Sequence, residues 1–116
     1  MKKLQARIER YTYRVTWSQE DGEYLGLCAE FPSLSFLAVT RARALAGISR
    51  VVQEVVGDMQ ANGESIPEPL GLHEYSGKFV VRVPPHVHRR LAMEAAEGGI
   101  SLNRLVSDKL SYEFGR

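Results

Sequence analysis

The chain has 116 residues, of which 44% are hydrophobic and 25% charged, with a formal net charge of +1. This composition is that of one globular domain or of two very small ones, and a single cysteine excludes an intramolecular disulfide. Small units without disulfides are commonly stabilised by association, so an oligomer is expected. Residues 1–10 lack the apolar core of a signal peptide and no stretch approaches the length of a membrane span, so we expect a cytoplasmic protein with no membrane partner.

Alternating apolar residues predict the first strand. In residues 11–17, polar residues alternate with apolar ones, and the apolar residues are predicted to form one buried face: Tyr11, Tyr13, Val15 and Trp17. A turn follows at Glu20, Asp21 and Gly22, and residues 24–29 then form the second arm of a hairpin. Pro32 interrupts the pattern, and a weaker third strand is expected over residues 34–39.

A long amphipathic helix is predicted next. Thr40 is a suitable N-cap, and Asn62 with Gly63 marks the end of the helix. Apolar residues recur between these points at spacings of three and four, at Leu45, Ile48, Val52, Val55, Val56 and Met59. We therefore expect this helix to pack on the sheet.

The stretch from residue 64 to residue 77 is predicted to be a linker or an extended crossing, because it has little periodicity and contains Pro67, Pro69, Gly71 and Gly77. We place a first domain at residues 1–70, a linker at 71–77 and a second domain at 78–116. Residues 78–116 carry seven basic and four acidic residues, against eight and ten in the rest of the chain. This asymmetry alone does not predict a nucleic-acid partner.

The second domain opens with a short strand that ends at Pro84 and Pro85. One face of this strand carries Lys78, Val80 and Arg82, and the other carries Phe79, Val81 and Val83. A helix starting at His86 follows, with Val87, Leu91 and Ala95 on one stripe, and Gly98 and Gly99 close it. Ser101 then caps a second helix whose apolar stripe is Leu102, Leu105, Val106 and Leu110.

A lone strand before two helices lacks partners for its backbone groups and a cover for its apolar face. Pairing with a second copy supplies both. In that dimer Phe79, Val81 and Val83 would form a shared core, while Lys78, Val80 and Arg82 would face outward, where a two-stranded ribbon can enter a DNA major groove.

The segment GKFVVRVPPHVHRRLAMEAAEGGISLNRLVSDKL resembles the ribbon-helix-helix domain of the Arc and MetJ repressor class. That resemblance implies that Lys78, Val80 and Arg82 contact bases and that Ser101, Leu102 and Asn103 hold a phosphate. A helix N-terminus is a natural anion site. Arg104 lies in the first turn of that helix, where the dipole opposes a cation, so either it contacts the same phosphate or it is a solvated side chain.

Residues 11–32, the helix opening at Thr40 and the segment NGESIPEP resemble the HicB antitoxin domain, which is described as a partial RNase H-like fold. The Pro-Gly-Cys often seen in that family is missing from FPSLSFLAVT. The helix starts with the basic residues Arg41 and Arg43, where the family usually has acidic residues. The fold class expected for the whole chain is therefore α+β, with a small antiparallel sheet and one helix followed by a ribbon-helix-helix.

Other chemistry is less well supported by the sequence. Asp21, Glu23, Glu30 and Glu54 could be metal ligands of a nuclease, but acidic residues at turns are more often solvated. His86 and His88 lie on different faces of a helix, so no metal or other cofactor is expected. Cys28 is interpreted as a small buried residue, and the aromatic residues of the first strand as core rather than as a platform for bases.

The resemblance implies a type II antitoxin that is not an enzyme. Its first domain would neutralise a HicA-type, mRNA-cleaving toxin, and its tail, as a homodimer or higher oligomer, would repress its own operon at operator DNA. An acidic surface from Glu20 to Glu30 would suit a basic partner. The alternatives are a solitary transcriptional regulator without a toxin and, in third place, a metal-dependent enzyme that would require Asp21.

Overall fold

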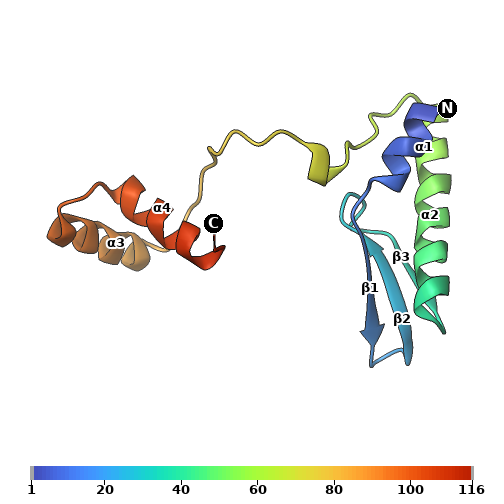
Figure 1. The fold of residues 1–116 in the computed structure, drawn as a ribbon, viewed down its shortest axis with the longest axis horizontal. Coiled ribbons are helices and arrows are strands. Elements are labelled where there is room, and N and C mark those ends of the chain that lie inside the picture. Colours follow the sequence, from blue (N-terminus) through green and yellow to red (C-terminus); the bar gives the residue numbers. More distant parts are fainter. Residues whose placement is uncertain (1, 116) are drawn as a thin grey trace. The chain divides into compact units, whose positions relative to one another are not determined.

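A computed structural model describes residues 2–115 as an α+β chain that divides into two compact units, residues 1–76 and residues 77–116. The first unit holds helix α1 (Lys2–Glu9), three strands, helix α2 (Arg41–Ala61) and the 3₁₀ turn η1 (Leu70–Leu72). The second unit holds helices α3 (Pro85–Gly98) and α4 (Leu102–Glu113). Figure 1 labels the helices and strands of both units.

The three strands predicted for the first domain form one antiparallel sheet in the order β1-β2-β3. They are β1 (Tyr13–Ser18), β2 (Glu23–Cys28) and β3 (Ser35–Ala38). Gly22 has a φ of 66°, which is the left-handed conformation that the predicted hairpin turn requires. Val15 is opposite Gly26, and Gly26 is opposite Phe36, so these three positions lie on one face of the sheet.

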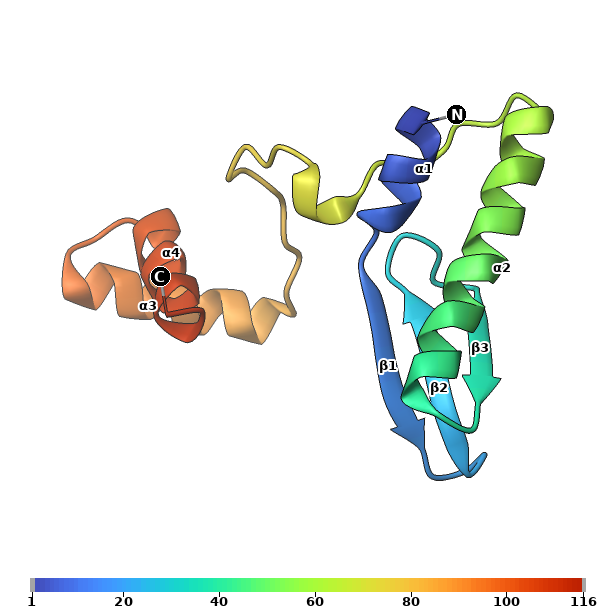
Figure 2. The ribbon, with the colours of Figure 1, turned by 45° about the vertical axis from the view of Figure 1, so that its right-hand side comes forward.

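Helix α2 covers that face of the sheet, as Figures 1 and 2 both show. The predicted cap is present: the Thr40 hydroxyl accepts a hydrogen bond of 3.1 Å from the Arg43 N–H. The buried face of α2 consists of Ala44, Gly47, Ile48, Val52 and Val56. Leu45, which was predicted to lie on this face, is 45% exposed, because the closest approach to the sheet is made by Ala44 and Gly47 instead.

Trp17 was also expected to be buried, and this was wrong, since 48% of its surface is exposed. It lies near the end of β1, where its ring packs edge to face on Tyr24 with centroids 5.0 Å apart. Its indole N–H donates a hydrogen bond of 2.9 Å to the Gln19 side chain. The alternating pattern predicted the strand correctly, but α2 does not cover its far end.

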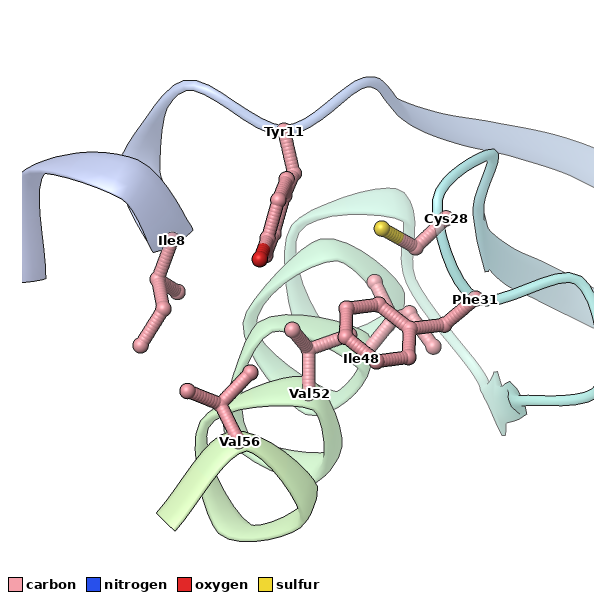
Figure 3. Close-up of a cluster of buried hydrophobic side chains, with 7 residues drawn as sticks. All are labelled: Ile8, Tyr11, Cys28, Phe31, Ile48, Val52 and Val56. Atoms are coloured by element: carbon pink, nitrogen blue, oxygen red, sulfur yellow. The ribbon is translucent and has the colours of Figure 1, made fainter. Parts of the chain in front are cut away.

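Helix α1 was not predicted, because the composition of residues 1–10 is polar and basic and shows no clear apolar period. It packs against α2 and contributes Ile8 to the core. Figure 3 shows this core, in which Tyr11 and Phe31 pack edge to face with ring centroids 5.4 Å apart. The other members come from α2 and β2: Ile48, Val52, Val56 and Cys28. Single apolar residues in a short polar helix leave little periodic signal in the sequence.

The segment after α2 is anchored to the first unit by hydrogen bonds to its backbone. The Arg7 guanidinium donates to the Ile66 carbonyl at 3.2 Å, and the Tyr11 hydroxyl donates to the Pro67 carbonyl at 2.7 Å. The Leu70 N–H donates to the Glu30 carboxylate at 2.8 Å. This part of the sequence, which has the composition of a linker, is therefore an ordered crossing held by α1, by Tyr11 before β1 and by Glu30 after β2.

Candidate nucleic-acid interface

Two helices joined by a tight turn form the second unit. Helix α3 begins at Pro85, one residue before the predicted start, because proline is tolerated in the first turn of a helix. Gly99 ends it with a φ of 68°, and the Ile100 N–H returns to the Ala95 carbonyl at 3.1 Å. Gly98 belongs to the helix itself, so Gly99 supplies the positive φ.

The amino end of α4 is the predicted phosphate site. Ser101 is the N-cap, and its hydroxyl accepts a hydrogen bond of 3.0 Å from the Arg104 N–H. The N–H groups of Leu102 and Asn103 lie in the same first turn and have no acceptor among the described residues. Two backbone donors and the positive end of the helix dipole are therefore open to an anion.

Arg104 has a partner that was not predicted from the sequence. Its Nε atom lies 3.9 Å from an oxygen of Asp108, one turn further along α4. The spacing of four residues is visible in the sequence and could have predicted the pair. Both side chains are largely exposed, at 71% and 64%, so the pair contributes at most about 1 kcal/mol. Asp108 nevertheless reduces the electrostatic cost of a cation near the helix N-terminus.

Residues 78–83, predicted as a strand, carry no regular secondary structure in the single chain. The side chains expected to face DNA, Lys78, Val80 and Arg82, are all exposed. The side chains expected to form a dimer core are exposed too, at 74% for Phe79, 63% for Val81 and 42% for Val83. A strand is defined by hydrogen bonds to a second strand, so the ribbon stays a prediction about two chains.

The second unit buries very little of its own apolar surface. Among residues 77–115 the buried side chains are those of Ala95 and Leu105, and the predicted stripe residue Leu110 is 44% exposed. An ion pair of 3.0 Å between Lys109 and Glu94 links α4 to α3. The exposed large apolar residues of this unit are Phe79, Val80, Val81, Val83, Met93, Leu110, Tyr112 and Phe114. So small a core with so much apolar surface is typical of a module stabilised by association.

The acidic residues of the first unit do not form the single surface that the sequence suggested. Glu20, Asp21 and Glu23 lie at the β1–β2 turn, whereas Glu30 lies beyond the other end of β2, about 20 Å away along the strand. The Glu30 carboxylate also accepts hydrogen bonds from the Thr12 N–H at 2.8 Å and from its hydroxyl at 3.1 Å. Glu30 is thus part of the internal anchor of the chain.

The environments of Glu30 and Cys28 shift their pKa values in opposite directions. Partial burial disfavours the charged Glu30, but the hydrogen bonds donated by Leu70 and Thr12 outweigh it and lower the pKa of the carboxyl. Burial raises the pKa of Cys28 to about 11, so the thiol is protonated at neutral pH and is a poor nucleophile. Within residues 2–115, no group of three or more histidine, cysteine or acidic side chains could hold a metal ion.

The structure is a two-unit α+β chain that ends in a helical pair with many exposed large apolar side chains. A model of the HicB family matches residues 61–110, from the last residue of α2 into α4, so this part of the chain is similar to that family. No curated protein matches the chain, and no solved structure does either. None of the helices within residues 2–115 is long and apolar enough to cross a membrane.

Proposed function

We propose that this chain is the antitoxin of a type II toxin-antitoxin pair and that it represses its own operon through a dimeric C-terminal DNA-binding module. The observation that carries the proposal is the HicB family match over residues 61–110, which spans the exposed segment at residues 78–83 and α3. The first unit would bind and cover a small HicA-type ribonuclease. No catalysis is required of the chain, because covering a surface is enough to block a toxin.

The small core of the second unit supports the dimer in this proposal. A two-fold pair would place Phe79, Val81 and Val83 between the two chains and leave Lys78, Val80 and Arg82 outside. Apolar surface that leaves water contributes about 25 cal/mol per Å², so covering these side chains offers a strong driving force. The outward face, which carries the basic residues Lys78 and Arg82, would then enter the DNA major groove.

Sedimentation of two matched variants tests the dimer. Val81→Asp would bury a charge in the shared core and should dissociate or unfold the second unit. Val80→Asp makes the same change one residue earlier, on the outward face, and should leave the dimer intact. Equal sedimentation of the two variants, or a monomeric wild-type chain with a well-folded tail, would contradict the ribbon arrangement.

DNA titrations test which residues recognise sequence. Arg82→Ala should cost about 1 to 3 kcal/mol and relax the preference for one base of each half-site. Arg104→Ala should weaken all sequences alike and lower the salt slope by about one unit for each phosphate that is no longer neutralised. Arg90→Ala removes the same charge from α3 and is the control. Unchanged operator preference in Arg82→Ala would exclude the outward face as the base-contacting surface.

A solitary regulator without a toxin is the second candidate, and one observation favours it. The HicB match begins at Ala61, the final residue of α2, so it leaves out the sheet and the rest of that helix. Co-purification with a small basic protein encoded beside this chain would support the antitoxin. If that neighbouring protein is absent or does not bind, the regulator is the better proposal.

A further inference from the structure

Strand β3 leaves one edge of the sheet open. It is the outer strand of the order β1-β2-β3, and Figure 2 shows it along the side of the sheet away from β1. Apart from the ladder with β2, no backbone hydrogen bond within the described residues involves residues 35–39. In an antiparallel ladder every second residue of an edge strand directs its N–H and C=O away from the sheet. These groups are available to a further strand.

Although β3 is short, two common protections of such an edge, charge and proline, are missing. Residues 35–39 read SFLAV, with no proline, lysine or other charge, which are the features that normally block pairing with another chain. Leu37 is 40% exposed and Val39 is 62% exposed. Leu37 is opposite Leu25 in the ladder, on the face of the sheet that α2 does not cover. A strand added here would meet an apolar surface on that face.

The face toward α2 has different chemistry beside the same edge. A hollow of about 460 Å³ runs along β3 and is lined by Arg43 and Arg50, which lie two turns apart on α2. Neither arginine has an ion-pair partner within the described part of the chain. Ala46 lies between them and leaves room, and Glu23 is the one acidic residue in the lining. The hollow is therefore basic.

We propose that the β3 edge binds an extended segment of a partner protein as a fourth strand, with apolar side chains on one face and acidic side chains on the other. Backbone pairing would supply affinity, and the alternation of side chains would supply specificity. The apolar face would meet Leu37 and Val39, and the acidic face would meet Arg43 and Arg50. This site goes beyond the proposed function and does not depend on it.

A second copy of this chain is a poorer occupant of the edge. Antiparallel pairing of two β3 strands about a two-fold axis would bring both α2 helices to the same face of the joined sheet. Arg43 and Arg50 of one copy would then lie beside the same arginines of the other, and like charges repel. Charge complementarity thus selects an acidic segment.

Synthetic peptides and the full chain provide the test. The probe is an eight-residue peptide that alternates glutamate with valine and isoleucine, and its twin carries lysine in place of glutamate. In ¹⁵N-resolved NMR titrations the acidic peptide should shift the amide signals of residues 35–39 and bind about tenfold more tightly than its twin. N-methylation of every second peptide amide should abolish binding, because it blocks strand pairing and leaves the side chains unchanged.

Charge reversal supplies a second measurement on the protein. The double variant Arg43→Glu with Arg50→Glu should prefer the lysine peptide, whereas Arg89→Glu with Arg90→Glu, on α3, should behave like wild type. The proposal is overturned if the N-methylated or the lysine peptide binds wild type as well as the acidic one does, or if the shifts lie outside residues 35–39. It is equally overturned if, without peptide, these signals shift with protein concentration, because a second copy then occupies the edge.

Discussion

Replacing Gly47 in helix α2 with alanine should destabilise the first unit, although alanine is the better helix former. A Cβ atom at Gly47 would overlap the Cδ2 and Cε2 atoms of Phe36 and would lie 2.6 Å from its Cγ. Since Cγ is where the ring is attached, rotating the ring about its own axis cannot relieve the overlap. Either Phe36 leaves its place on the sheet or α2 moves away from β3.

Gly57→Ala is the matched control, because Gly57 lies in the same helix and a Cβ there meets nothing within 4 Å. Both changes gain about 0.8 to 1.0 kcal/mol of helix propensity, so this gain cancels when the two variants are compared. The difference between their free energies of unfolding then isolates the overpacking cost, which is about 1 to 3 kcal/mol. Gly57→Ala should be more stable than wild type, and Gly47→Ala less stable than Gly57→Ala.

Urea denaturation measures both variants. The chain has a single tryptophan, Trp17 in β1, so its fluorescence reports on the first unit, and circular dichroism at 222 nm provides an independent signal. Phe36→Leu should reduce the difference between the two alanine variants, because the smaller side chain removes the overlapping ring atoms. If both alanine variants stabilise the chain equally, the close packing of α2 on β3 is incorrect.

Further predictions concern the anchor, the buried thiol and the helix cap. Glu30→Gln should lower the free energy of unfolding by about 1.5 kcal/mol at pH 7, since hydrogen bonds to a charged group are the stronger kind. Because the folded-state pKa of Glu30 is lowered, its contribution to stability is present above the ordinary pKa of 4.5 and is lost as the pH falls through the folded-state pKa. If the stabilities of wild type and Glu30→Gln depend on pH in the same way, this prediction is contradicted. Cys28 should react with a disulfide reagent at pH 8 far more slowly in native protein than in urea, and equal rates would mean that the thiol is not buried. Ser101→Ala should lower stability by about 1 kcal/mol, as measured by urea denaturation, while Ser107→Ala on the exposed side of α4 should have little effect.

Features that depend on neighbouring residues were predictable from the sequence. The caps at Thr40 and Ser101, the turn at Gly22 and the helix end at Gly99 each follow from the chemistry of a few adjacent residues. The period of two likewise identified β1, and the period of three to four identified the long helices, whereas the alternation over residues 78–83 is not a strand in the single chain. In the candidate interface, the cap at Ser101 was predicted for the same reason, and the Arg104–Asp108 pair is equally local, although it was not predicted.

The tertiary structure alone decided which surfaces are covered. The pattern placed Trp17 and Leu45 on apolar faces, but how far each face is covered depends on where α2 crosses the sheet, and that is set by Gly26, Ala44 and Gly47. The anchor of Leu70 on Glu30 joins residues forty positions apart, so no local pattern encodes it. Periodicity determines the direction of a side chain from its own element, whereas burial and pairing depend on what packs against that element. For the same reason, the pairing of residues 78–83 depends on a second chain.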